Sequence, residues 1–238
     1  MLIFLITALL TCCSADKDPV NDNPAPTPTE TGGPAQASDT LTYLALGDSY
    51  TIGHSVSEQE RWPVQLVDML NRSDHKAVLE HPDIIAKTGW TTQELRNAVE
   101  DQNKSRDYGL VSLLIGVNNQ YRGYPLEDYP SEFEMLLNIA IAHAGGDRSR
   151  VFVVSIPDYG YTPFGQSSRE KITTEIDAYN EINKRITQEK DIKYIYITDI
   201  SRRGLDDPSL VAEDGLHPSG RQYQLWVQKM LSDSSFFE

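Results

Sequence analysis

The amino-acid sequence predicts an α/β domain in which a five-stranded parallel sheet lies between two layers of helices. Short apolar runs rich in β-branched residues alternate with amphipathic helical segments from residue 41 onward. Strict alternation of strand and helix favours right-handed crossovers between parallel strands. Residues 41–238 also have a normal size for one domain with a single core. Together these observations predict a three-layer α/β/α sandwich.

Each element of this sandwich rests on a local pattern. The runs short enough to be buried strands are 41–46, 84–86, 110–115, 151–156 and 194–198. Helical periodicity predicts helices over 62–71, 92–101, 131–144, 169–188 and 219–232. In the first of these helices, Val64, Val67 and Leu70 recur at helical spacing. The carboxyl ends of the strands should gather at one edge of the sheet, where parallel α/β proteins place their functional groups.

The segment before this domain predicts export. Residues 2–10 form an apolar run that is too short to span a bilayer and has the place of a signal-peptide core. Leu10-Thr11-Cys12-Cys13 resembles a bacterial lipobox in which Cys13, or else Cys12, becomes the lipidated amino terminus. No Lys or Arg precedes the run, so an ordinary cleaved signal or a simple apolar start stays an alternative. We expect residues 1–13 to be a signal peptide and the protein to be a membrane-anchored lipoprotein in the periplasm or at the cell surface.

The amino-acid composition and net charge of the chain exclude several classes of partner. Residues 14–40 are rich in Pro and Thr and nearly lack large apolar residues, which predicts a disordered tether. The formal net charge of −14 offers nothing to neutralise phosphates and argues against a nucleic-acid partner. No Walker loop, no Gly-x-Gly-x-x-Gly after a strand and no His-Glu-x-x-His occurs, so nucleotide and zinc-peptidase functions lack support. We expect no cofactor, no metal, and a monomer whose membrane contact is the lipid anchor alone.

A serine after the first strand is the candidate nucleophile. Ser49 stands in Gly47-Asp48-Ser49-Tyr50, where a strand is predicted to turn into a helix, and such a turn exposes a hydroxyl to a substrate. Its backbone amide, near a helix start, can point at developing negative charge. Asp and Ser are also common helix-capping residues, so this segment alone does not separate a nucleophile from a cap.

Asp214 and His217 are the candidate partners of that serine. Their spacing of three residues, in a turn with Gly215 and Pro218, lets the carboxylate reach Nδ1 while Nε2 faces Ser49. A turn cap beside a histidine that precedes a helix is the plainer alternative. The other histidines lack an acidic residue at such spacing and are expected to be surface or structural: His54, His75, His81 and His143.

Two further residues are candidate donors to an oxyanion. Gly89 follows the second predicted strand and, without a side chain, can bring its backbone N–H close to a substrate. Asn118 follows the third strand and adds a side-chain amide. Each alone could be an ordinary turn residue. With the amide of Ser49, they complete an oxyanion hole for ester cleavage.

These residues resemble the SGNH hydrolase superfamily, also called the GDSL esterases, whose name gives the Ser, Gly, Asn and His found here. The resemblance spans residues 41 to about 227. Segments 114–123, 155–164 and 214–220 are similar to a lysophospholipase-like bacterial branch. The resemblance implies a flavodoxin-like fold and metal-free hydrolysis through an acyl-serine intermediate. Tyr50 replaces the family's common Leu, and Asn119 replaces the usual Asp, which removes a negative charge near the site.

The sequence therefore predicts a serine esterase that hydrolyses carboxylic esters. The candidate substrate contacts are Asp48, Tyr50, Trp90 and Tyr121. Loop aromatic residues can stack on sugar rings or line a short acyl slot, and further ones are Tyr124, Tyr159, Tyr161 and Phe164. No long apolar segment suggests a deep tunnel for an acyl chain, which favours acetyl groups on a glycan or a small alcohol.

Other functions use the same residues. A lysophospholipase or thioesterase would act on lipid or thioester substrates, and an O-acyltransferase would deliver the acyl group to an alcohol instead of water. A lipid-anchored carbohydrate-binding protein could keep the shape of the site without activity. A metallo-hydrolase built on Asp48, Asp214 and His217 is the least favoured.

Overall fold

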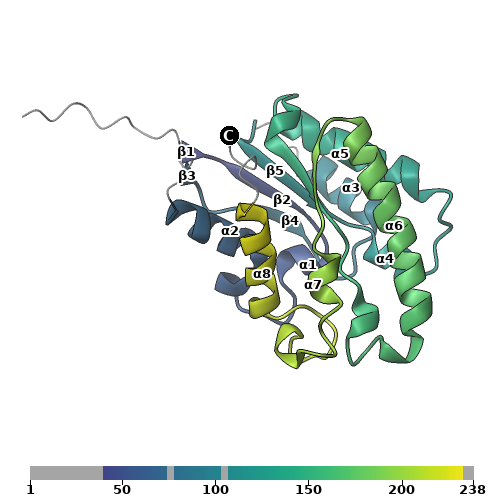
Figure 1. The fold of residues 1–238 in the computed structure, drawn as a ribbon. Helices are drawn as coiled ribbons and strands as arrows, with labels where there is room; N and C mark the ends of the chain where they lie inside the picture. Colours follow the sequence, from purple (N-terminus) through teal and green to yellow (C-terminus); the bar gives the residue numbers. More distant parts are fainter. Residues whose placement is uncertain (1–39, 74–77, 103–106, 233–238) are drawn as a thin grey trace, which may run out of the picture. The chain divides into compact units, whose positions relative to one another are not determined.

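A computed structural model describes residues 40–73, 78–102 and 107–232. Within them, one sheet has five parallel strands in the order β4-β2-β5-β6-β7 (Figure 1). The strands are β2 (Tyr43–Gly47), β4 (Asp83–Ala86), β5 (Leu110–Leu114), β6 (Val151–Val154) and β7 (Lys193–Ile195). Taken in chain order this is the flavodoxin-like arrangement, which reverses direction between β2 and β5. The predicted fold class is confirmed.

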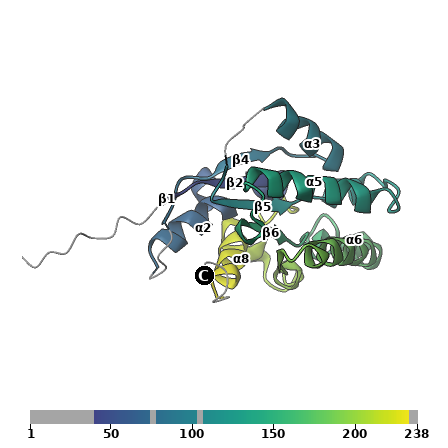
Figure 2. The same ribbon diagram turned by 90° about the horizontal axis from the view of Figure 1, so that it is seen from above.

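The reversal distributes the helices between two layers. Because each crossover between parallel strands is right-handed, the connection from β2 to β4 and those running the other way lie on opposite faces. Helices α2 (Trp62–Asn71) and α8 (Gly220–Leu231) pack together on one face. Helices α3 (Thr92–Asp101), α5 (Tyr129–His143) and α6 (Arg169–Glu189) pack side by side on the other (Figures 1 and 2). The strands between them are buried on both faces, as β2, β5 and β6 are along their whole length.

Sequence patterns located the long elements well and some of their ends less well. The helices predicted over 62–71 and 92–101 have those bounds in the structure. The predicted strand 194–198 is too long at its carboxyl end, because Thr198 begins the short helix α7 (Thr198–Ser201). The Thr198 hydroxyl donates to the carbonyl of Ile156 at 2.8 Å, beyond the end of β6.

The amino-terminal predictions lie outside the described residues. These are the signal peptide, Cys13 and the tether up to residue 39. Thr40, the last residue of the predicted tether, pairs with Val78 in a short parallel ladder between β1 (Thr40–Leu41) and β3 (Val78–Leu79). No helix in the described part of the chain is long and apolar enough to cross a membrane.

The carboxyl ends of β2 and β5 approach each other closely. A Cβ added to Gly47 would lie 2.6 Å from the carbonyl oxygen of Leu114, so only glycine fits there. Helix α1 (Ser49–Ile52) starts two residues after the end of β2, and helix α4 (Val117–Tyr121) starts three residues after the end of β5. Residues that leave these two strands therefore begin next to one another.

Candidate active site

Ser49 is the first residue of α1. The Asp48 side chain caps this helix by accepting the backbone N–H of Tyr50 at 3.0 Å, which sets the tight turn out of β2. Ser49 borders a cavity of about 240 Å³ together with Gly89, Asn118 and His217. Four separate segments of the sequence thus bring their predicted site residues to one cavity.

Asp214 and His217 form the predicted carboxylate–imidazole pair. Asp214 Oδ2 and His217 Nδ1 are 2.6 Å apart, and Oδ1 accepts the backbone N–H groups of Leu216 and His217, each at 2.9 Å. Because an ionised carboxylate only accepts hydrogen bonds, Nδ1 carries the proton. Nε2 then has a free lone pair and can accept a proton, as a general base must.

The surroundings of the pair tune both pKa values. Burial lowers the pKa of His217 below its usual 6.5, while Asp214 works in the opposite direction through its hydrogen bond and charge. Burial opposes ionisation of Asp214, but hydrogen bonds from Ser55 and from the backbone N–H groups of His217 and Leu216 outweigh it. They hold the pKa of that carboxyl well below its usual range. At neutral pH the pair is therefore a carboxylate beside a neutral imidazole.

Ser55 is a member of the site that sequence reasoning missed. Its hydroxyl donates to Asp214 Oδ2 at 2.6 Å from a position 159 residues earlier in the chain. Ser55 has a φ of 66°, in the left-handed region that few non-glycine residues adopt. No spacing rule links two such distant positions, so no sequence signal pointed to this contact.

Gly89 stands in a tight turn after β4. The turn is closed by a hydrogen bond from the Trp90 N–H to the Lys87 carbonyl at 3.2 Å. Gly89 has a φ of 87°, which a residue with a Cβ rarely adopts. Arg122 donates from Nη2 to the Gly89 carbonyl at 2.6 Å and also contacts Glu94 at 3.4 Å. Arg122, which the sequence did not single out, holds this turn against α4.

Asn118 is oriented by the same turn. Its Nδ2 donates to the Trp90 carbonyl at 2.9 Å. Since an amide nitrogen carries two hydrogens, this bond leaves a second N–H for a ligand in the cavity. The Ser49 amide, the Gly89 amide and this side chain are the three donors that the sequence predicted for an oxyanion hole, and all three residues border the cavity.

Asn119, the departure from the usual family Asp, has a structural role. It is buried, accepts the backbone N–H of Thr92 at 3.0 Å, and donates from Nδ2 to Thr92 Oγ1 at 2.7 Å and to Glu132 at 3.2 Å. It thereby ties α4 to the start of α3 and to α5. An ionised Asp at position 119 would have no N–H group to donate to the Glu132 carboxylate.

Two of the predicted substrate contacts need correction. Asp48 is wrong as a substrate contact, because it is completely buried beneath the nucleophile and burial raises its pKa to about 7. Trp90 does not border the cavity: it packs against the core and presents its carbonyl to Asn118. Tyr50 and Tyr121 do border the cavity, and Tyr121 is 60% exposed.

A larger groove adjoins the cavity that contains Ser49. It has a volume of about 720 Å³ and shares Tyr121, Tyr159 and Phe164 with the cavity. Those three rings pack against one another with centroids 6.2–6.4 Å apart. Beyond them the groove is lined by further aromatic and polar side chains, among them Tyr124, Tyr179, Gln120, Lys171 and Glu175.

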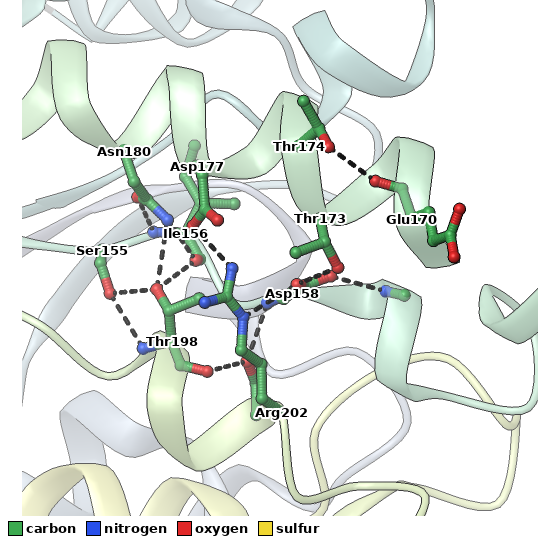
Figure 3. A network of polar contacts seen from close by, with 12 residues as sticks. Ser155, Ile156, Asp158, Glu170, Thr173, Thr174, Asp177, Asn180, Thr198 and Arg202 are labelled. Carbon is green, nitrogen blue, oxygen red and sulfur yellow. Dashed lines mark hydrogen bonds and ion pairs between the residues drawn. The ribbon is translucent and has the colours of Figure 1, made fainter. Parts of the chain in front are cut away.

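A polar network holds the segment that carries Tyr159 (Figure 3). Asp158 is fully buried, and its Oδ2 accepts from Arg202 Nε at 3.0 Å and from Thr173 Oγ1 at 2.8 Å. Arg202 also binds Asp177 at 2.6 Å. The side-chain amide of Asn180 pairs with both the N–H and the carbonyl of Ile156. The chain leaving β6 is thus fixed to α6 and α7 by paired charges and satisfied backbone groups.

Comparison with known proteins identifies the family of this chain. Residues 45–225 match the model of the GDSL-like Lipase/Acylhydrolase family. No curated protein matches the chain. The fold is similar to that of esterase EstA from a Pseudoalteromonas species, with a TM-score of 0.60 at 18% identity over 81% of this chain and 95% of that one.

Two other solved structures have the same fold. An acetylxylan esterase from Geobacillus stearothermophilus gives a TM-score of 0.64 at 17% identity, covering 82% of this chain and 94% of that one. A lipase from a goat rumen metagenome gives 0.65 at 17% identity, covering 82% and 98%. The family match extends over most of the chain and includes every residue that borders the catalytic cavity. The chain therefore belongs to the GDSL-like lipase/acylhydrolase family.

Proposed function

We propose that the protein is a serine esterase that removes short acyl groups, acetyl foremost, from a glycan or a small alcohol. The observation that carries this proposal is the unequal size of two adjoining spaces. The cavity with Ser49 and His217 measures about 240 Å³, below the range of about 300–1,000 Å³ typical of pockets for drug-sized ligands. The groove beside it, at about 720 Å³, lies within that range. A small acyl group and a larger alcohol portion suit these two spaces.

The proposed reaction is acyl transfer to Ser49 and then to water. His217 Nε2 accepts the hydroxyl proton while Ser49 Oγ attacks the ester carbonyl, and Asp214 stabilises the resulting imidazolium. The backbone N–H groups of Ser49 and Gly89 and the side-chain amide of Asn118 donate to the oxyanion. His217 then gives its proton to the departing alcohol oxygen. A water molecule then attacks the acyl-serine in the same way: His217 accepts its proton and returns a proton to Ser49 Oγ as the acid leaves. We propose that neither step needs a metal.

The lining of the groove favours a carbohydrate over an acyl chain. Tyr121, Tyr124 and Phe164 are between 45% and 60% exposed, and aromatic faces of this kind stack on apolar faces of sugar rings. Lys171 and Glu175 lie on the same lining and form an ion pair at 3.8 Å. Charged groups of this kind suit hydroxyl-rich ligands and oppose burial of a long hydrocarbon. One protein of similar fold is an acetylxylan esterase, in line with this class.

We also propose that the chain is exported and anchored through Cys13. The support is the apolar run of residues 2–10 and the lipobox-like sequence that follows it. Both lie outside the described residues. The lysophospholipase-like branch, the thioesterase and the acyltransferase remain predictions from sequence.

The first prediction concerns the proposed triad. On p-nitrophenyl esters from acetate to palmitate, Ser49→Ala and His217→Ala should lower kcat by roughly 10⁴-fold or more, and Asp214→Asn should be milder. Activity should be highest on acetate and fall with chain length. Asn118→Ala should cost about 10²- to 10³-fold, because it removes one oxyanion donor. Unchanged circular dichroism would show that the variants fold, and a Ser49→Ala variant as active as wild type would refute the mechanism.

The second prediction concerns pH. The reaction needs neutral His217, so kcat/KM should rise with pH through the pKa of that imidazole, which burial holds below 6.5. Asp214 raises this pKa, so Asp214→Asn should move the acid limb to still lower pH as well as reduce the plateau. The measurement is kcat/KM for p-nitrophenyl acetate between pH 4 and pH 9. A midpoint above 6.5, or an upward shift in Asp214→Asn, would contradict the assignment of the base.

The third prediction concerns the groove. Tyr124→Ala should lower kcat/KM on acetylated oligosaccharides by about five- to tenfold through the loss of one stacking face, and leave p-nitrophenyl acetate hydrolysis unchanged. Tyr196→Ala is the matched control, because Tyr196 is an exposed tyrosine (41%) outside the groove lining. Equal losses on both substrates would argue against a glycan site. Formation of acyl-sugars faster than free acid would identify an acyltransferase instead.

The fourth prediction concerns the anchor. In a bacterial host, radiolabelled palmitate should be incorporated into the wild-type protein and into Cys12→Ala, and not into Cys13→Ala. The labelled protein should fractionate with membranes, because a lipidated chain partitions into the bilayer. Label that is lost only in Cys12→Ala would place the lipid on Cys12 instead of Cys13. The absence of label from the wild type would remove the lipoprotein proposal.

A further inference from the structure

We propose that His54, Asp214 and His217 form a binding site for a transition-metal cation such as Zn²⁺, and that occupation of this site switches catalysis off. The inference goes beyond the proposed esterase function, since it concerns regulation of the triad by an inhibitory ion. It depends on His54, a residue for which the proposed reaction has no use.

The three side chains lie close together, and one of them, His217, borders the cavity that contains Ser49. One potential ligand atom from each lies within 4.8 Å of the others. The imidazole rings of His54 and His217 have centroids 4.5 Å apart. His54 is exposed, so an ion from solvent reaches the cluster without passing through the cavity. His54 comes from the loop after α1, and the other two come from the turn before α8.

The His54 ring is already oriented as metal-bound imidazoles are. Its Nδ1 is 2.9 Å from the hydroxyl of Thr88. A metal-ligating histidine usually places its second nitrogen in such a hydrogen bond, which sets the tautomer and the ring direction. Nε2 is then the nitrogen of His54 that binds the ion.

Two imidazoles and one carboxylate are a donor set that Zn²⁺ takes in proteins. Bond lengths of about 2.0–2.2 Å place tetrahedral ligand atoms roughly 3.3–3.5 Å apart. Ligand atoms that lie up to 4.8 Å apart therefore have to approach by about 1.5 Å at most, and the exposed His54 side chain can supply that movement. If His217 binds through Nδ1, that atom and Asp214 Oδ2 have to move apart from 2.6 Å. Water completes the coordination. The excess of acidic residues in the chain, with a formal net charge of −14, raises the local concentration of cations.

The bound ion inhibits catalysis whether it binds Nε2 or Nδ1 of His217. An ion on Nε2 occupies the lone pair that accepts the Ser49 proton. An ion on Nδ1 requires the other tautomer of the neutral ring, with the proton on Nε2, so Nε2 has no lone pair for the Ser49 proton and the hydrogen bond to Asp214 is broken. In both cases Ser49 loses its base, and the ion holds the ring in a position that catalysis cannot use.

The test is Zn²⁺ binding and inhibition in the full-length protein, purified in detergent and in a non-chelating buffer. Calorimetry with ZnCl₂ should show one ion per chain, and Co²⁺ should give the visible absorption of a tetrahedral site. His54→Gln should weaken Zn²⁺ binding at least tenfold. The same variant should keep its uninhibited ester hydrolysis and resist Zn²⁺, while EDTA restores the inhibited wild type.

His143→Gln is the matched control. Its ring packs against Tyr108, ahead of β5, and it ends α5, so it should leave Zn²⁺ binding unchanged. Zn²⁺ affinity in His54→Gln equal to that of wild type, or no stoichiometric binding in wild type, would overturn the proposal. Binding is measured without turnover, so a protein inactive on every ester would defeat the proposed function and leave this test intact.

Discussion

The close approach of β2 and β5 at their carboxyl ends is the constraint on which the site depends. Gly47 and Leu114 are paired in the sheet, and a side chain at position 47 would collide with the Leu114 carbonyl. The chain leaving β2 reaches Ser49 two residues later, and the chain leaving β5 reaches Asn118 within its first helical turn. Ser49 and Asn118 therefore start from adjacent backbones, and their separation is set by the spacing of the two strands rather than by long loops.

Asp214, the acidic partner of His217, stays ionised because it accepts several hydrogen bonds. Asp214 accepts the Ser55 hydroxyl, two backbone N–H groups and the imidazole, so ionisation is favoured although the group is partly buried. His54 lies against His217, with ring centroids 4.5 Å apart. A histidine that is poised as a base is also a good ligand, because both tasks need a neutral imidazole with an available lone pair. The proposed triad and the proposed metal site therefore both depend on His217 and Asp214.

The cavity and the groove are lined largely by different elements of the fold. The small cavity is lined by residues that follow β2, β4, β5 and β6 and by Leu216 and His217, whereas most of the groove is lined by α6 and by the segment from Gln120 to Leu126. Both spaces also include Tyr159 and Phe164 from the chain between β6 and α6. That chain contains the buried Asp158, whose charge is compensated by Arg202. A buried charge that lost its partner would be costly, so the pair holds the Tyr159 segment in one position. Under the proposed function, variation of the aromatic residues that line only the groove, such as Tyr124, would change the alcohol portion that is accepted.

The sequence by itself determined what depends on local spacing. Alternating periodicities predicted the layers, and the three-residue interval between Asp214 and His217 predicted their hydrogen bond because both lie in one turn. Tertiary structure alone decided the contacts between distant segments: Ser55 with Asp214, His54 with His217, and Arg122 with Gly89. It also decided that Asp48, polar and next to the nucleophile, points into the core. A pattern along the chain reports which face a residue takes within its own element, whereas these contacts arise only when elements are packed at a common sheet edge.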